Sequence, residues 1–389
     1  MNIRRAICFS ASLLLLSCSN EPSATPNGGT NPNNGTRTDA GTSAGADTGT
    51  GTGNPNVPEL PLGAGVRTLA GAAESGTADG PRGTSRFNNP ANVAVGPDGR
   101  IFVADYDNGL IRVLRGDGQT TTFTRQANFS RPFGLVFASD GTLYAQTDSD
   151  DMGGRSYTTG TLWRVARDGQ ATPLARGLGR PRGLAALGDG RIVMADPEHH
   201  TVRVFNPANQ QVAPLAGALD QPGYADGAGD VARFNRPYDI VVVGDRILVA
   251  DQNNHRLRAV TLAGVVSTVA GAGVMGTADG PAMTARFNRP QALARDGVGN
   301  LYVTDMDGYV VRRVAPDGTV STVAGAGRAG FQDGELMEAR FFGLEGMDVT
   351  PDGAYLYIAD GNRGGSDANH RVRRVATGVV PGVTPEEQH

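Results

Sequence analysis

The sequence contains no lysine and only two cysteines, and both absences limit what the protein can be. All 35 basic residues are arginine, against 39 acidic residues, which gives a formal net charge of −4. A chain without a basic excess lacks the electrostatic signature of a general nucleic-acid binder, so we expect no nucleic-acid partner. Cys8 falls within a predicted leader, so Cys18 has no partner for an internal disulfide and the fold must be stabilised by packing.

Long apolar runs are also scarce, and the one candidate lies at the N-terminus. Arg4 and Arg5 precede an apolar stretch over 6–16 that is too short to span a bilayer, and Leu-Leu-Ser-Cys follows at 15–18. This order resembles a bacterial lipobox, which implies a signal peptide over 1–17 and lipid attached to Cys18. An ordinary secretory signal that happens to contain cysteine is the alternative. We expect a protein of the bacterial cell envelope, held by a lipid anchor alone and facing the periplasm or the cell exterior.

Large apolar residues are almost missing from the segment that follows. Residues 18–62 are rich in Gly, Thr, Asn, Ala and Pro, so they cannot bury enough surface to offset their ordering entropy. We predict a disordered tether, which as a flexible coil would hold the next domain roughly 35 to 40 Å from the membrane.

The rest of the chain is built from one repeated unit. The loop "GTADGPAMTARFNRP" at 276–290 has close copies at 76–90 and 223–237, and each precedes an apolar strand, an Asp-Gly turn and a strand such as "ILVAD". Six units recur about every 50 residues, each with strands that we call A to D in chain order. The predicted A strands lie near 92–96, 134–138, 183–187, 238–243, 291–295 and 346–350.

Short strands joined by tight turns at this period are typical of propeller blades, which stack in a ring. Complete A, B and C strands occur six times, but no convincing D strand follows Val375, and a spare strand stands at 66–70. We therefore predict an all-β, six-bladed propeller over 63–378, closed by the pairing of 66–70 with the last blade. Residues 379–389 are expected to form a C-terminal tail, and the propeller is expected to be a monomer.

Two strings carry a resemblance to a known family. "NNHRLRAV" at 253–260 and "ANHRVRRV" at 368–375 resemble the Asn-His core of NHL repeats, and the long loop resembles that of a bacterial NHL lipoprotein subgroup. The resemblance covers 63–378, strongly in blades 1, 4, 5 and 6 and loosely in blades 2 and 3. It implies a six-bladed propeller, in a family whose members include RNA binders, sensor ectodomains and a zinc-dependent lyase that acts on hydroxyglycine peptides.

Five B strands end in aspartate, and the C strand of the same blade carries an arginine. Because neighbouring strands bring these positions within reach, we predict a charge-assisted pair inside each of these blades. Blade 2 has Thr147 and Trp163 instead, so the pair is lost there as a unit. A functional ring of carboxylates is the alternative. The predicted pairs are Asp105 with Arg112, Asp196 with Arg203, Asp251 with Arg258, Asp305 with Arg312, and Asp360 with Arg373.

The repeated loop is interpreted as a connector between blades. Its Asp-Gly pairs, at 79, 226, 279 and 333, suit Asx-type turns with a glycine at positive φ. The phenylalanines at 87, 234, 287 and 341 are expected to fill the gap between blades. His200, His255 and His370 begin C strands, roughly 10 Å outside the A strands, so they cannot share one metal ion and are predicted to stabilise turns.

The long connections, including insertions at 148–159 and 361–369, all fall on one face of the predicted ring. Variable loops on a rigid scaffold are where binding usually resides. Near the axis on this face, just before strand A, stand Arg131, Arg180, Arg236 and Arg289, and Asn89 in blade 1. These guanidiniums could converge on one anionic ligand, or could pair with loop carboxylates.

The blade 2 insertion also offers a weaker metal hypothesis. Asp148, Asp150 and Asp151 in "DSDDMGG" suggest Ca²⁺, although Met152 stands where an oxygen ligand belongs and Thr159 replaces the closing Glu. A solvated acidic loop is the alternative, and no other cofactor is expected. The function predicted is a binding module for a protein or an anionic glycan or carboxylate. A metal-dependent lyase or lactonase with a site in the channel is the second hypothesis. It ranks below the binding module because the sequence contains no recognisable catalytic motif.

Overall fold

The structure is a computed structural model that describes residues 63–365 and 369–378. They all belong to one compact unit, Glu59–His389. The predicted signal peptide, Cys18, the tether up to residue 62 and the tail over 379–389 lie outside the described residues. Within these residues, no helix has the length and hydrophobicity needed to cross a membrane.

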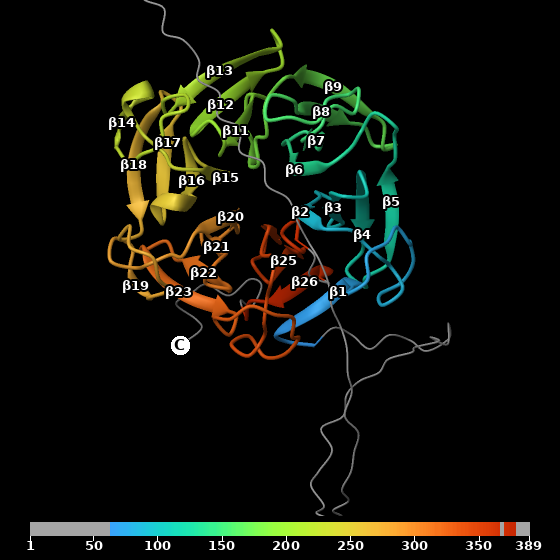
Figure 1. Cartoon of the computed structure of the whole chain (residues 1–389). Helices are drawn as coiled ribbons and strands as arrows, with labels where there is room; N and C mark the ends of the chain where they lie inside the picture. Colours follow the sequence, from blue (N-terminus) through green and yellow to red (C-terminus); the bar gives the residue numbers. More distant parts are fainter. Residues whose placement is uncertain (1–62, 366–368, 379–389) are drawn as a thin grey trace, which may run out of the picture. The chain divides into compact units, whose positions relative to one another are not determined.

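Six antiparallel sheets form the blades of a ring, as the sequence predicts (Figure 1). Strands A and B of each blade pair through tight turns, because apolar residues of high β-propensity are bounded by Gly and Asp. The A strands are β2 (Pro90–Val95), β6 (Pro132–Phe137), β10 (Leu184–Ala186), β15 (Pro237–Val243), β20 (Pro290–Arg295) and β24 (Gly346–Val349). The B strands are β3 (Ile101–Asp105), β7 (Leu143–Thr147), β11 (Ile192–Asp196), β16 (Arg246–Asp251), β21 (Leu301–Asp305) and β25 (Tyr355–Asp360).

The outer half of each blade consists of strands C and D. The C strands are β4 (Leu110–Leu114), β8 (Thr161–Val165), β12 (Thr201–Asn206), β17 (Arg256–Thr261), β22 (Val310–Val314) and β26 (His370–Ala376). The D strands are β5 (Thr120–Thr124), β9 (Ala171–Arg176), β13 (Gln211–Ala216), β18 (Val265–Ala270), β23 (Thr319–Ala324) and β1 (Val66–Ala72). Two short 3₁₀ turns, η1 (Gly229–Val231) and η2 (Gln252–Asn254), interrupt the connections of blade 4.

The ring is closed by the two ends of the described chain. Strand β1 pairs antiparallel with β26, with Val66 opposite Val375 and Ala72 opposite His370, so the first and last strands lie side by side in Figure 1. Val66 and Leu69 are fully buried, and burial of two such side chains stabilises the closure by about 3 to 6 kcal/mol.

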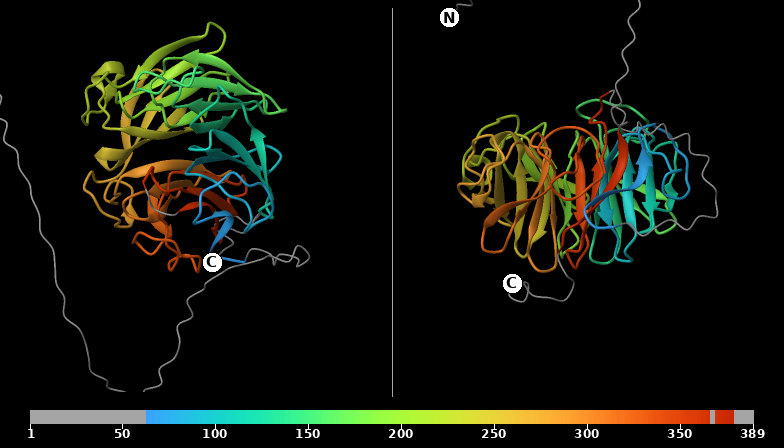
Figure 2. Two further views of the ribbon diagram at one scale, coloured as in Figure 1. Left: turned by 45° about the vertical axis from the view of Figure 1, so that its right-hand side comes forward. Right: turned by 90° about the horizontal axis from the view of Figure 1, so that it is seen from below.

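The core lies between neighbouring blades. One buried cluster joins Tyr302 and Val311 of blade 5 to Phe341 and Leu356 of blade 6, and equivalent clusters fill other junctions. The inner strands crowd the axis: a Cβ added to Gly183 would lie 2.6 Å from the Cα of Asp239, so only glycine fits there. Tight A-to-B and C-to-D turns meet on one face and long connections on the other, and Figure 2 shows the ring edge-on between these two faces.

The repeated loops run along the rim of the blade that follows them. In blades 4 and 5 they add a fifth strand, β14 (Gly227–Ala228) or β19 (Gly280–Pro281), beside strand D. In blades 1 and 6 single bridges do the same, Gly80 with Thr120 and Gly334 with Val66. These loops therefore cover edges that would otherwise be free to pair with another chain.

Candidate functional site

The five predicted carboxylate–guanidinium pairs are all in contact inside their blades. The N···O distances run from 2.7 Å for Asp251 with Arg258 to 3.3 Å for Asp305 with Arg312. Four of the five arginine side chains are fully buried; Arg203, in blade 3, is the exception. Charges this far from solvent act as internal braces, which favours the structural interpretation over a functional ring.

Each repeated loop supplies a second carboxylate to this brace. Asp226 accepts a hydrogen bond from Arg258 Nη2 at 2.6 Å and two from Thr268, through its backbone N–H and its hydroxyl, both at 3.2 Å. The prediction of simple Asx-type turns was therefore incomplete, since the loop aspartate ties the connector to strands C and D. The same contacts join Asp79 to Arg112, Asp279 to Arg312, and Asp333 to Arg373.

The loop phenylalanines are fully buried, as expected, and they also contact the brace. The Phe234 ring centroid lies 5.3 Å from the Arg258 guanidinium carbon, within reach of a cation–π interaction. Phe87, Phe287 and Phe341 lie at 5.1 to 5.3 Å from their own arginines.

The three histidines, predicted to stabilise turns, also join neighbouring blades. Each accepts a hydrogen bond at Nδ1 from the backbone N–H of the residue that precedes strand A of the next blade. Burial, followed by the nearby Arg289, lowers the pKa of His255, which favours the neutral imidazole that this hydrogen bond requires. The bonds join Asn89 to His370 at 2.9 Å, Arg236 to His200 at 3.1 Å, and Arg289 to His255 at 3.3 Å.

A cavity of about 360 Å³ opens at the channel mouth on the long-loop face. Of the five predicted ligand-binding residues, Asn89, Arg131 and Arg180 line it. Arg236 and Arg289 are not among its lining residues. They are held by Glu198 at 3.3 Å and by Asp307 at 3.2 Å, so the predicted ring of four arginines does not converge.

Three arginines that the sequence analysis overlooked complete the cavity: Arg155, Arg182 and Arg363. Arg182 follows Pro181, just before strand A of blade 3, and its guanidinium carbon lies 4.1 Å from the Phe133 ring centroid. Arg363 belongs to the blade 6 insertion and pairs with Asp307 at 2.7 Å. Arg155 belongs to the blade 2 insertion, inside the segment that the sequence analysis interpreted as an acidic calcium loop.

Asp148 is the buried centre of this arrangement. Its carboxylate binds Arg182 at 2.8 Å and Arg180 at 2.8 Å, and accepts a 2.6 Å hydrogen bond from the Tyr106 hydroxyl. Burial alone would raise the pKa of Asp148, but the two guanidiniums and the hydroxyl outweigh it and hold the pKa below its usual range. One carboxylate thus serves two cations.

The three carboxylates of the calcium hypothesis do not converge in this structure, because each is bound to different partners. Asp148 binds the two arginines, and Asp151 pairs with Arg176 at 2.6 Å. Asp150 accepts hydrogen bonds from the backbone N–H groups of Met152 and Gly154, at 3.0 and 2.7 Å. No group of three His, Cys, Asp or Glu side chains that could hold a metal ion occurs within 63–365 and 369–378.

The cavity lining also carries a carboxylate and a phenol hydroxyl. Glu345 accepts a hydrogen bond from Gln291 at 3.2 Å, and burial raises the pKa of its carboxyl group. Tyr238 also lines the cavity, and its hydroxyl has no hydrogen-bond partner among the described residues. A ligand here meets guanidiniums, a carboxylate and a phenol.

Two further carboxylates lie deeper in the channel, at strands A of blades 4 and 6. Asp239 accepts hydrogen bonds from the N–H groups of Ile240 at 2.9 Å and Leu293 at 2.8 Å, and Asp348 accepts one from Val95 of the first blade. Burial raises the pKa of Asp239 to about 7. These carboxylates link inner strands of adjacent blades.

Comparison with known families agrees with the repeat pattern. The NHL repeat family matches residues 87–114. NHL repeat-containing protein 2 of Gallus gallus is 27% identical over 300 residues, covering 62% of this chain and 41% of that protein. SUPPRESSOR OF QUENCHING 1 of Arabidopsis thaliana is 25% identical over 233 residues, covering 51% of this chain and 22% of that protein. The matched region therefore spans less than half of these relatives.

Solved structures share the fold at low sequence identity. A Bacteroides ovatus protein described as an auxiliary nutrient binding protein superposes with a TM-score of 0.63 at 20% identity, over 80% of this chain and 76% of that one. A Bacteroides thetaiotaomicron protein of unknown function gives 0.63 at 22% identity, over 80% and 75%. At such identities the similarity establishes the propeller architecture.

Proposed function

Because the chain is an NHL-repeat β-propeller of six blades, we propose that it is a binding module whose channel mouth captures an anionic glycan or carboxylate. The observation that supports this most strongly is the sharing of Asp148 between Arg180 and Arg182. Arg155 adds a further cation, since its one hydrogen bond among the described residues is to the Tyr106 hydroxyl at 3.4 Å. Charge-assisted bonds to carboxylates are the natural use of such guanidiniums.

The cavity suits an acid that also carries hydroxyl groups. A carboxylate would lie against Arg155 and Arg180, while sugar hydroxyls would donate to Glu345 and exchange hydrogen bonds with Tyr238. The volume of about 360 Å³ fits one or two sugar units. The Bacteroides proteins described as auxiliary nutrient binding proteins have the same fold. A uronic acid of a polysaccharide is a nutrient that carries both a carboxylate and hydroxyl groups.

The experiment compares charged and neutral forms of one ligand. Isothermal titration of the full mature chain with tri-galacturonate should show binding, and the methyl ester of the same trisaccharide should bind at least about tenfold more weakly, because each lost charge-assisted bond removes about 1.5 to 3 kcal/mol. Equal affinity for acid and ester would show that the guanidiniums do not bind the carboxylate, and the proposal would fail.

We also propose that the propeller is held at the bacterial cell envelope through lipid on Cys18. Replacement of Cys18 by alanine should release the protein from the membrane fraction of expressing cells, and metabolic labelling with a fatty acid should mark only the unsubstituted protein. Membrane retention of the Cys18→Ala protein would contradict the anchor without affecting the proposal for the channel mouth.

A further inference from the structure

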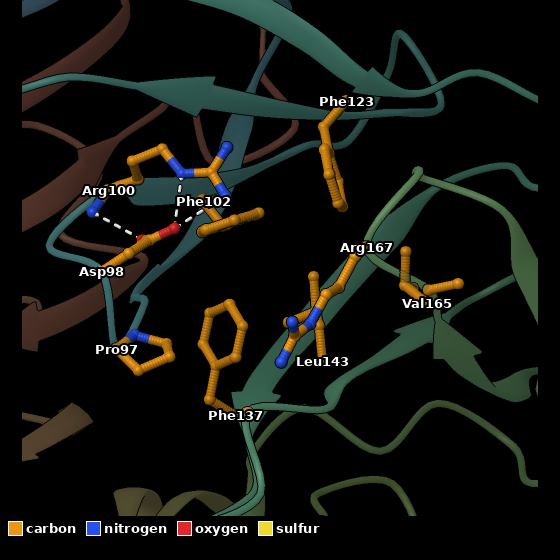
Figure 3. A pocket seen from close by; sticks show the side chains of 11 residues that line it. Pro97, Asp98, Arg100, Phe102, Phe123, Phe137, Leu143, Val165 and Arg167 are labelled. Carbon is orange, nitrogen blue, oxygen red and sulfur yellow. Dashed lines mark hydrogen bonds and ion pairs between the residues drawn. The ribbon is translucent and has the colours of Figure 1, made fainter.

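A second cavity opens on the face of the tight turns, between blades 1 and 2, and the proposed function makes no use of it. Its volume is about 410 Å³, within the range of small-molecule sites. The A-to-B turns of both blades and the C-to-D turn of blade 2 form its rim. Figure 3 shows Phe102, Phe123, Phe137 and Arg167 around the same space.

Three phenylalanine rings form the apolar wall of this cavity. Phe102 of β3 is the centre of the group: the ring of Phe123 lies 5.1 Å away at an interplanar angle of 87°, and that of Phe137 5.0 Å away at 72°. Phe102 is 3% exposed, whereas Phe123 and Phe137 are only partly buried. The last two rings therefore keep apolar surface facing the cavity.

This aromatic group is specific to one junction of the ring. The same three positions occur at every junction and are defined by the strand registers: position 102 of strand B, the irregular position 123 of strand D, and position 137 of strand A in the next blade. No other junction has phenylalanine at any of the three, although tyrosine replaces Phe102 in three blades, as Tyr144, Tyr302 and Tyr357. Position 123 corresponds to Leu69, Leu174, Leu215, Val269 and Val323, and position 137 to Val95, Ala186, Val242, Arg295 and Val349. The fold therefore does not need aromatic rings at positions 123 and 137.

The rim of the cavity carries a net positive charge. Arg100 is paired with Asp98 at 2.7 Å, and its guanidinium carbon lies 5.3 Å from the Phe102 ring centroid. Arg167, on the C-to-D turn of blade 2, lines the cavity and has no hydrogen bond or ion pair among the described residues. An apolar wall beside one uncompensated guanidinium matches a ligand that is apolar at one end and anionic at the other.

We propose that this junction cavity binds a small aromatic carboxylate, with its ring packed against Phe123 and Phe137 and its carboxylate paired with Arg167. The aromatic wall favours a flat ring because perpendicular ring contacts add to the area buried. The site is separate from the channel mouth, so it takes a second and chemically different ligand.

The test uses 2-naphthoate as the probe and follows its binding to the full mature chain by calorimetry. Phe123→Leu is the most informative variant, since Leu69, Leu174 and Leu215 stand at the equivalent position of other blades and the fold accepts leucine there. We expect it to weaken binding about two- to tenfold, with an unchanged melting profile. Arg167→Gln should weaken binding about tenfold or more.

Three controls decide the outcome. Arg164→Gln removes an exposed arginine of β8 that does not line the cavity, and it should leave the affinity unchanged. Neutral 2-naphthamide should bind at least about tenfold more weakly than 2-naphthoate. Equal affinity of Phe123→Leu and the unsubstituted protein would overturn the proposal. So would loss of binding in Arg155→Gln but not in Arg167→Gln, since the probe would then occupy the channel mouth.

Discussion

The indole N–H of Trp163 donates a 2.8 Å hydrogen bond to the hydroxyl of Thr147, and both side chains are fully buried. In the other five blades the same two positions hold a carboxylate and a guanidinium. Blade 2 therefore replaces an ion pair with a neutral hydrogen bond between the same strands. This replacement avoids an unpaired buried charge, which would be the costly state.

Thr147→Val should destabilise the propeller by about 1 to 3 kcal/mol, because it leaves the buried Trp163 N–H without an acceptor. Chemical denaturation measures the change in free energy of unfolding. Thr147→Ser keeps the hydroxyl and serves as the control, with a smaller loss. A Thr147→Val protein as stable as Thr147→Ser would show that the hydrogen bond contributes nothing.

Blades 2 and 3 differ from the others at their outer edges as well. The D-strand residue opposite the C-strand arginine is threonine in the four blades whose connectors carry the aspartate. In blades 2 and 3, whose connectors are short, Pro173 lies opposite Trp163 and Pro214 lies opposite Arg203. Proline has no N–H to offer at a sheet edge, so it protects an uncovered strand from pairing with another chain.

Asp226→Ala should cost about 2 to 3 kcal/mol, because three hydrogen bonds to Arg258 and Thr268 disappear together. Asp230→Ala, an exposed aspartate of the same connector, is the matched control and should change the stability by less than about 0.5 kcal/mol. Equal effects of the two substitutions would show that the connector aspartate is not a brace.

The histidine bonds between blades predict a loss of stability in acid. The folded pKa of His255 is lowered from 6.5, so the folded state disfavours the proton that the unfolded state takes up. Its stabilising effect is complete above pH 6.5 and is lost as the pH falls through the folded pKa. His255→Asn keeps an acceptor that does not titrate and tolerates the left-handed backbone at this position, where φ is 54°.

Thermal melts of both proteins between pH 7.5 and 5 test this. The unsubstituted protein should lose stability relative to His255→Asn as the pH falls, by about 0.5 to 1.5 kcal/mol, the value of one hydrogen bond. A difference between the two proteins that stays constant across this range would contradict the role given to Nδ1.

Asp239 gives the opposite dependence on pH. Its folded pKa is raised from 3.8 to about 7, so the folded state holds the proton more tightly than the unfolded state. The stability it contributes is complete below pH 3.8 and is lost as the pH rises towards 7. Asp239→Asn should therefore gain about 1 to 2 kcal/mol relative to the unsubstituted protein between pH 4 and 8, after allowance for water in the channel. Parallel stability curves would contradict a raised pKa.

The architecture could be predicted from the sequence because the same unit of strands and turns recurs six times. Strand order, the closing strand and the five ion pairs all follow from positions that recur in each unit. Contacts between residues far apart within a unit were harder to predict. Asp226 resembled a turn residue, because its partner Arg258 lies 32 residues further along the chain.

The channel mouth was harder to predict, because it is made by residues that differ between blades. Arg236 and Arg289 occupy the same repeat position as Arg131, yet Glu198 and Asp307 draw them away from the cavity. Asp148 looked like a metal ligand because the arginines that neutralise it come from the next blade. The one signal in the sequence was the position of the blade 2 aspartate. The B strands of the other blades end in aspartate, whereas blade 2 has Thr147 at that position and Asp148 directly after it.

The most direct test of the central claim is the affinity of tri-galacturonate for Arg155→Gln and for Arg236→Gln, measured by calorimetry at one salt concentration. Arg155 lines the cavity, whereas Arg236 is bound to Glu198 outside it. A site formed by the channel-mouth guanidiniums predicts about a tenfold or greater loss of affinity in Arg155→Gln and an unchanged affinity in Arg236→Gln. Equal affinities of the two variants would place the anion elsewhere on the protein.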